Sequence, residues 1–191
     1  MVSAKNTDTK AEILRIGKQF IQFYGYNAFS YADIARELNV KNAAVHYHFR
    51  GKEDLLMALV DNYIENYQIL AKQLQNSKLG AIGKLDKFIE PYTSLCETDS
   101  ICIIGSVASD YNTLPESVKE KISSLIDLVM GMVEQVLAEG KKKGEVHFNE
   151  TARTQALLLM TNLAAGVQLA RISGKKDYDT IRKALIRKLK Q

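Results

Sequence analysis

Two histidines, His46 and His48, lie two residues apart in the segment VKNAAVHYHFRGK, which covers residues 40–52. Imidazoles at this spacing could bind a metal ion, act together in acid–base catalysis, or contact a polyanion. On a helix, however, residues i and i+2 point about 200° apart, so these side chains do not readily chelate one ion. The third histidine, His147, lies far away in the sequence. We therefore expect no metal site and no cofactor.

Motifs that would indicate an enzyme are missing from the chain. The segment GSVAS at residues 105–109 lacks the second glycine of a nucleophile elbow, and there is no phosphate-binding loop or zinc-protease motif. The carboxylates of Asp86, Glu90, Glu97 and Asp99 fit the exposed faces of helices. We therefore expect a protein without enzymatic activity.

The composition is that of an ordinary globular protein, with 46% hydrophobic and 25% charged residues among 191. No apolar run approaches the roughly 20 residues needed to span a bilayer, and residues 1–10 are polar. This predicts a cytoplasmic protein that does not contact a membrane. Cys96 and Cys102 form no C-x-x-C motif and are too few for a disulfide framework, so we expect free thiols.

Charge is distributed unevenly along the chain, although the net charge is only +4. Residues 1–53 hold 8 basic and 5 acidic side chains, residues 54–140 hold 6 and 13, and residues 141–191 hold 12 and 4. Basic segments at the two ends suggest an anionic partner. The alternative is that these charges only solvate helix surfaces.

Apolar residues recur at i, i+3 and i+4 along most of the chain, which predicts an all-α protein of about nine helices. The first helix is expected to begin at Thr9, in a capping box with Glu12, and to end before Gly25. A second start signal, SYAD at residues 30–33, opens a short helix that ends at Asn39. Further helices are expected at about 43–49, 52–75, 79–97, 101–111, 114–143, 150–173 and 177–190.

The two short helices within residues 30–48 have the form of a helix-turn-helix, with small Ala35 where they cross. In such a unit the second helix enters the DNA major groove and its first residues meet base edges. Asparagine can pair with adenine, and an alanine methyl can contact a thymine methyl. We therefore expect base contacts from Lys41, Asn42, Ala43 and Ala44. Imidazole, hydroxyl and ammonium groups suit phosphate oxygens, so we expect phosphate contacts from His46, Tyr47, His48 and Lys52.

Residues 9–59 resemble the amino-terminal domain of the tetracycline-repressor (TetR) family of one-component transcriptional regulators. The resemblance rests on S-x-x-D-I-A at residues 30–35 and on V-x-x-A-x-V-x-Y-H-F-x-x-K-E-x-L at residues 40–55. It implies a homodimer that binds a double-stranded DNA operator. It also implies base contacts from Asn42, Ala43 and Ala44. Lys41 and Ala44 stand where the family commonly has hydroxyl residues, and His46 replaces a frequent tyrosine.

The same resemblance implies two domains. Residues 1–54 would form the helix-turn-helix domain, with a long connecting helix from residue 52, and residues 55–191 would bind a small effector and form the dimer. An effector would release the operator, so the chain is expected to be a ligand-responsive repressor. The alternative is a DNA-binding module without an effector, which lacks ligand-dependent release.

Large apolar, aromatic and sulfur-containing side chains of the second domain could line an effector cavity. Methionine and cysteine repack readily around a bound guest. Cys96 or Cys102 could instead sense oxidants, but this needs a lowered thiol pKa, against which nearby Glu97 and Asp99 argue. The expected lining residues are Tyr63, Tyr67, Phe88, Tyr92, Cys96, Cys102, Met130, Met160 and Asn162.

The helix expected at 150–173, with Asn149 as its cap and Gly174 as its stop, is apolar nearly all round. A helix of this kind must be buried on most of its surface, so we expect it to pair with the last helix in a two-fold dimer interface. An inverted-repeat operator follows from that symmetry. The expected interface residues are Leu163, Gly166, Val167, Ala170, Tyr178, Ile181 and Leu185.

Overall fold

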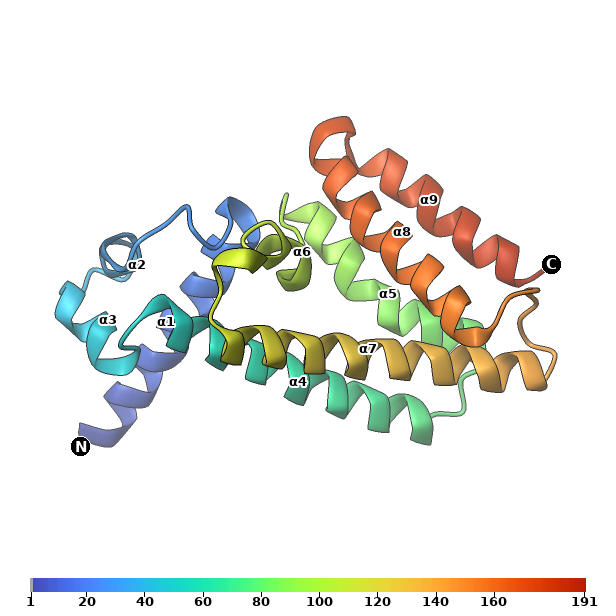
Figure 1. The fold of residues 1–191 in the computed structure, drawn as a ribbon, viewed down its shortest axis with the longest axis horizontal. Coiled ribbons are helices and arrows are strands. Elements are labelled where there is room, and N and C mark those ends of the chain that lie inside the picture. Colours follow the sequence, from blue (N-terminus) through green and yellow to red (C-terminus); the bar gives the residue numbers. More distant parts are fainter. Residues whose placement is uncertain (1) are drawn as a thin grey trace. The chain divides into compact units, whose positions relative to one another are not determined.

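Helices form the regular structure in the computed structural model, which describes the backbone of residues 2–191 and the side chains from residue 9 onward (Figure 1). This confirms the all-α prediction. In order, the elements are α1 (Val2–Tyr24), α2 (Tyr31–Glu37), α3 (Asn42–His48), α4 (Lys52–Asn76), α5 (Ala81–Glu97), α6 (Ile103–Ala108), the 3-10 helix η1 (Tyr111–Thr113), α7 (Glu116–Lys142), α8 (Ala152–Ser173) and α9 (Lys175–Leu189).

These helices divide into two compact units. The first comprises the chain up to Tyr63 together with Ile103–Ser124, and the second comprises Ile64–Cys102 and Leu125–Gln191. The two long helices α4 and α7 each contribute to both units.

The first unit is built on a core of aliphatic side chains. Ile13 of α1, Ile34 of α2 and Val45 of α3 are completely buried, as is Leu55 of α4. A Cβ built on Gly17 would lie 2.7 Å from Cδ2 of Leu55, so the glycine allows α1 and α4 to approach closely. Burial of these branched side chains fixes the short helices α2 and α3 against α1.

In the second unit, α8 and α9 pack against each other along their length and α5 packs against both. Helices α8 and α9 are joined at Gly174, whose φ of 92° is a backbone conformation that favours glycine. Tyr178 of α9 is completely buried and lies against Gly166 of α8. The backbone amide of Ala81, the first residue of α5, donates a 2.5 Å hydrogen bond to the carboxylate of Glu145. A residue from the loop after α7 therefore caps α5.

Most helix boundaries agree with the sequence prediction, and three do not. α1 begins at Val2, so the capping box predicted at Thr9 is wrong. The segment before Thr9 contains no proline or glycine that would stop the helix. The Glu12 carboxylate, predicted to cap the helix, instead pairs with Arg15 at 2.8 Å. α8 is capped by the hydroxyl of Thr151 rather than by Asn149. The helix predicted at 101–111 is shorter, because a turn after Ala108 leads into η1.

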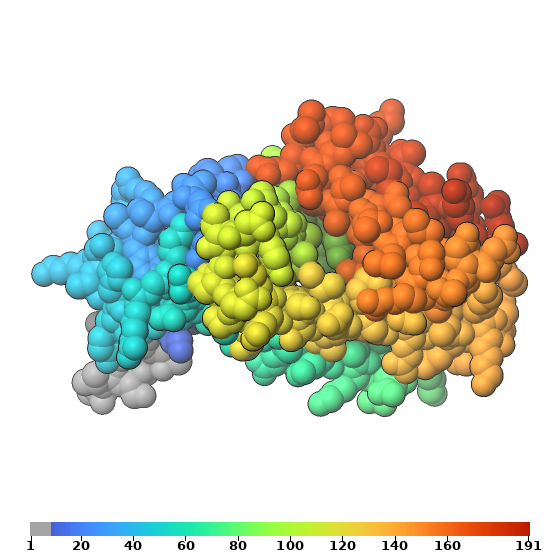
Figure 2. All heavy atoms as spheres, viewed as in Figure 1, coloured from blue at the N-terminus to red at the C-terminus, as the bar shows by residue number. Residues whose placement is uncertain are grey.

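The helix α8 is strongly apolar, as predicted, but it also meets the criteria for a membrane span, which the sequence did not predict for any segment. By length and mean hydropathy, 1.3 over its most apolar window, it could span a membrane, although core helices of soluble proteins meet the same criteria. Only 33% of that window is buried within the chain. Figure 2 shows α8, in orange, uncovered at the surface. Several large apolar side chains of α8 are therefore exposed in the single chain.

Candidate nucleic-acid interface

The helix-turn-helix predicted at residues 30–48 is present in the first unit. The carboxylate of Asp33 accepts hydrogen bonds from the backbone amide and the hydroxyl of Ser30, at 2.8 and 2.7 Å. These bonds lower the pKa of Asp33 and begin α2 at the predicted position. Asn39 adopts the left-handed conformation, with φ of 52°, and the amide of Val40 donates to the carbonyl of Ala35 at 2.9 Å. The turn is thus held by its own backbone.

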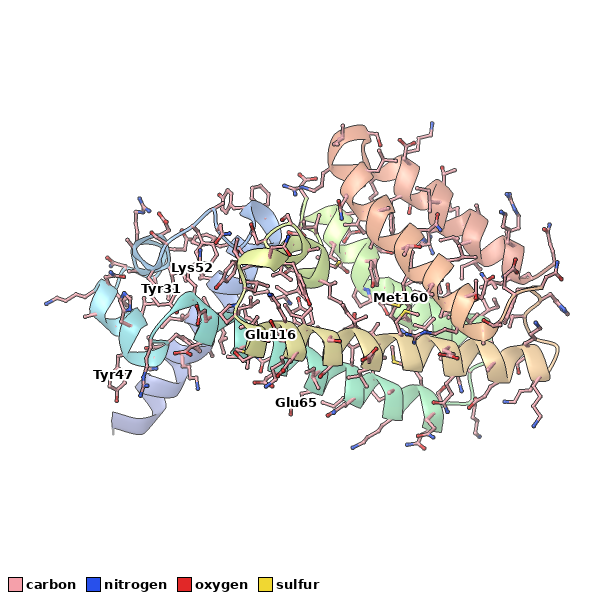
Figure 3. All side chains as sticks on the ribbon, in the orientation of Figure 1. Tyr31, Tyr47, Lys52, Glu65, Glu116 and Met160 are labelled. Atoms are coloured by element: carbon pink, nitrogen blue, oxygen red, sulfur yellow. The ribbon has the colours of Figure 1, made fainter. Side chains whose placement is uncertain are left out.

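Helix α3 has one buried face and one exposed face. Val45 is completely buried and Phe49, directly after the helix, is 4% exposed. Lys41, Asn42 and Ala43 are exposed, and Tyr47 is 75% exposed. Figure 3 shows Tyr47 pointing away from the helices of its unit. The residues expected to read bases thus lie where a DNA groove could reach them, with Ala44 half-buried beside them.

The two histidines have different surroundings. His46 is exposed, and its Nδ1 lies 3.2 Å from the carbonyl oxygen of Arg50. Because a carbonyl only accepts, Nδ1 must carry the proton, which leaves Nε2 of the neutral ring as an acceptor. His46 can therefore donate to a phosphate only when its ring is protonated. His48 is half-buried, with its ring edge-on to Tyr47 at a centroid distance of 5.2 Å.

Lys52 has an internal partner that the sequence did not suggest. Its ammonium donates a 2.8 Å hydrogen bond to the carbonyl of Phe29 and lies over the rings of Phe29 and Tyr26, at 4.2 and 4.9 Å from their centroids. Burial lowers the pKa of Lys52. An ammonium has three protons, so this contact leaves two for other acceptors.

Tyr31 forms a second link to the start of α4. Its hydroxyl donates to the carbonyl of Gly51, and burial raises the pKa of this phenol. Figure 3 shows Tyr31 and Lys52 near each other in the first unit. Together these two side chains attach the segment before α2 and its first turn to the first turn of α4. The sequence contains no local signal for either link, since Tyr31 and Gly51 lie 20 positions apart.

Metal ligation finds no support in the part of the chain that the structure describes, where no group of three or more His, Cys, Asp or Glu residues could hold an ion. The histidines of α3 are engaged with Arg50, Tyr31 and Tyr47.

Comparison with protein families matches two segments of the chain. Residues 13–59 match the family described as bacterial regulatory proteins, tetR family. Residues 81–185 match the tetracyclin repressor-like C-terminal domain. The chain belongs to the TetR family. It is therefore a TetR-family transcriptional regulator, with the helix-turn-helix and the carboxy-terminal domain of that family.

Solved structures of other TetR-family regulators share this fold. A regulator from Agrobacterium tumefaciens is 25% identical, covers 97% of this chain and 100% of its own, and superposes with a TM-score of 0.89. One from Legionella pneumophila is 29% identical, with coverage of 94% and 96% and a TM-score of 0.82. The fatty acid metabolism regulator protein of Bacillus subtilis is 22% identical over 136 residues, which are 71% of this chain and 69% of that protein.

The residues expected to line an effector cavity of this TetR-family regulator are partly brought together. Phe88 and Tyr92 are buried and their ring centroids lie 5.6 Å apart. Burial raises the pKa of Tyr67 to about 12, with a contribution from Cys102. Tyr92 has a raised pKa for the same reasons, with Tyr67 and Cys102 contributing. Tyr67, Tyr92 and Cys102 therefore lie close to one another in the second unit.

The other expected cavity residues are placed differently. Tyr63 belongs to the first unit, where the ammonium of Lys18 lies 5.3 Å from its ring centroid. Asn162 is exposed and its amide donates to the carbonyl of Leu158 at 2.7 Å. Met130 is buried, while Met160 is half-buried on α8 (Figure 3).

Cys96, the remaining cavity candidate, is a half-buried free thiol. Burial raises the pKa of Cys96, with further upward contributions from Asp179, Glu97 and Asp99. Lys175 acts in the opposite direction but pairs with Glu97 at 2.7 Å. A raised pKa disfavours the thiolate that oxidant sensing requires.

The residues expected at a dimer interface are mostly covered by the chain itself. Leu163, Val167, Ala170 and Tyr178 are buried, as is Gly166. Ile181 and Leu185 are half-buried. Apolar side chains that stay exposed on α8 are Leu157, Leu158, Leu169 and Ile172. The outer surface of α8, rather than its contact with α9, is thus available to a second chain.

Proposed function

We propose that this regulator is a ligand-responsive repressor that binds an inverted-repeat operator as a homodimer and is released by a small, largely apolar effector. In this proposal residues 1–54 bind DNA, residues 55–191 bind the effector and form the dimer, and the protein acts in the cytoplasm without enzymatic activity. The observation that carries the proposal is the exposed amino-terminal face of α3 on a fixed helix-turn-helix.

DNA recognition divides between two groups of side chains. Asn42 and Ala43 are exposed at the start of α3, where they would meet base edges together with Lys41 and Ala44. Tyr47 is exposed at the other end of the helix, and it would bind phosphates together with His46, His48 and Lys52. Base contacts determine which sequence is bound, and phosphate contacts determine how salt weakens binding.

The dimer would form through the outer surface of α8. Ile172 is 88% exposed, and Leu157, Leu158 and Leu169 are each about half exposed. Apolar side chains gathered on one helix in this way mark an interaction surface. A two-fold axis through this surface would repeat the α3 reading helix, which requires an inverted-repeat operator.

Effector binding in the second unit would act through α4. This helix is continuous from Lys52 to Asn76, and Lys52 at its first turn is bonded to the segment before α2. A ligand that prefers one tilt of α4 would therefore change the position of the DNA-binding helices. The name of the B. subtilis relative, a fatty acid metabolism regulator, is consistent with an effector that carries an apolar chain.

A gel-shift experiment with the purified regulator tests this proposal. An operator is first selected from a random duplex library, and complexes are then challenged with a panel of metabolites and drugs. Ligands for the panel are found by thermal shift, since a ligand at 100 times its dissociation constant stabilises a protein by about 2.7 kcal/mol. We expect at least one stabilising ligand to release the operator. A regulator that binds DNA equally with every stabilising ligand would contradict the effector role.

A further inference from the structure

A groove in the second unit lies outside the residues discussed above. It has a volume of about 430 Å³ and is lined by residues of the second half of α4, the first turn of α5 and the second half of α7. Small-molecule sites have volumes of about 300–1,000 Å³. Among the described residues that line it, none belongs to the set expected from the sequence to line an effector cavity.

The floor of the groove is apolar. Leu74 of α4 and Met132 and Val136 of α7 line it and are more than nine-tenths buried within the chain. Leu128, one turn before Met132, is half-buried on the same side. Such a floor favours an apolar body in the ligand, because contact removes hydrocarbon surface from water on both sides.

The rim carries a lysine whose side chain is mostly covered by the protein. The side chain of Lys84 is only 11% exposed, and its nearest carboxylate, Glu139, lies 3.9 Å away, beyond hydrogen-bond distance. The other oxygen of Glu139 accepts a 2.9 Å hydrogen bond from Gln135. Most of the Lys84 side chain is therefore covered by the protein, while its ammonium has one carboxylate within ion-pair distance and no hydrogen bond to it.

Charge at the rim favours an anion. Lys72 and Lys84 contribute two positive charges and Glu139 one negative charge, so one carboxylate in the ligand would balance the site. A carboxylate in the ligand could accept a hydrogen bond from the ammonium of Lys84. A cationic ligand would meet two ammonium groups and only one carboxylate, which is already bonded to Gln135.

We propose that this groove binds a small amphiphile with a single carboxylate, the head on Lys84 and the apolar body on Leu74, Met132 and Val136. As an assignment of the effector class, the proposal rests on the effector-dependent function proposed above. As a binding site, it stands independently of that function.

The probe is octanoate, compared with octan-1-ol, which has the same chain without the charge. Binding is measured by calorimetry and by the methyl resonances of methionine labelled with carbon-13. The resonance of Met132, assigned by Met132→Leu, reports the groove, and that of Met160 reports a separate place on α8. We expect octanoate to bind, to shift Met132 and to leave Met160 unchanged.

Variants test the role of Lys84. Lys84→Met keeps an unbranched apolar side chain but removes the charge, and should weaken octanoate binding by about tenfold to a hundredfold, the usual effect of a charged hydrogen bond. Octan-1-ol should bind this variant as it binds the wild type. Glu139→Gln should tighten octanoate binding. Lys87→Met is the matched control on α5, because Lys87 is exposed and pairs with Glu90. This variant should bind octanoate with the affinity of the wild type.

The proposal is overturned if octanoate fails to bind, if octan-1-ol binds equally well, or if Met160 shifts while Met132 does not. The function proposed above is tested separately, by measuring operator affinity with and without octanoate. If octanoate shifts Met132 but operator affinity stays unchanged, the groove is a binding site but not the effector site. If a ligand releases the operator and shifts only Met160, the regulator is ligand-responsive but its effector does not bind in the groove.

Discussion

Replacement of Lys52 by methionine should weaken both the fold of the DNA-binding unit and its hold on phosphate. The 2.8 Å bond to the Phe29 carbonyl is a charged hydrogen bond, worth about 1.5–3 kcal/mol. The ring contacts with Phe29 and Tyr26 add about 0.5–1 kcal/mol. Burial of the ammonium, which lowers the pKa of Lys52, offsets part of this gain. Since methionine keeps the apolar stem, the net loss should be about 2 kcal/mol.

Urea denaturation measures this loss. The urea concentration at the unfolding midpoint should fall, while the slope of unfolding free energy against urea concentration stays unchanged. Lys10→Met is the control, because the ammonium of Lys10 lies 5.7 Å from the Phe49 ring centroid on an exposed side chain. This variant should lose less than about 0.5 kcal/mol. Equal stability of Lys52→Met and wild type would refute the structural role of this ammonium.

DNA binding separates the second role of Lys52 from the first. If its remaining protons reach a phosphate, Lys52→Met should flatten the plot of log affinity against log salt by about 0.9 for each phosphate lost, whatever the DNA sequence. A loss of stability with an unchanged salt slope would leave Lys52 as a structural residue and remove it from the phosphate contacts.

Three further changes test other parts of the structure. Gly140→Ala should destabilise the protein by about 1–3 kcal/mol, because its Cβ would lie 2.4 Å from Cβ of Ala81; Gly131→Ala, at an open position of the same helix, should be neutral or stabilising in the same denaturation assay. Burial raises the pKa of Tyr178 to about 12. Between pH 10 and 12 this phenol therefore ionises in the unfolded chain but not in the folded protein, and stability falls as pH rises. Between pH 10 and 12 the unfolding free energy of Tyr178→Phe should fall by about 2–3 kcal/mol less than that of the wild type. Denaturation of both proteins at several pH values in this range measures the difference. Asn42→Ala should change the preferred base at one operator position, with a loss of about 1–3 kcal/mol for the original base, in competition binding with single-base variants.

The helix-turn-helix could be predicted from the sequence because its signals are local. The capping pair Ser30 and Asp33 and the left-handed Asn39 lie within the segment that they shape. The position of α3 follows from them, as does its exposed face. The same holds for Gly174, whose φ of 92° ends α8 where predicted.

Long-range partners could not be predicted in this way. Glu145 caps α5 at Ala81, 64 positions away, and Lys52 bonds to a carbonyl 23 positions away. Neither pair has a sequence pattern, since each depends on how helices pack. The groove was missed for a related reason. Its floor is made of ordinary core residues such as Leu74, and the position of Lys84 beside it depends on how α5 packs against α7.

The dimer prediction shows a third limit. Sequence periodicity indicated that α8 must be buried on most of its surface, but it did not show which side α9 would cover. Packing of Tyr178 against Gly166 covers one side, and Ile172 is left 88% exposed on the helix. The surface proposed for the partner is therefore carried by different residues from those expected.

Selection of bound sequences from a random duplex library tests the central claim most directly. We predict that the wild-type protein enriches one inverted repeat, with half-sites separated by about one helical turn of 10–10.5 base pairs or a multiple of it. Asn42→Ala should enrich a repeat of the same spacing with altered bases. Enrichment of no sequence, or of a single unrepeated site, would contradict a dimer that reads DNA through α3.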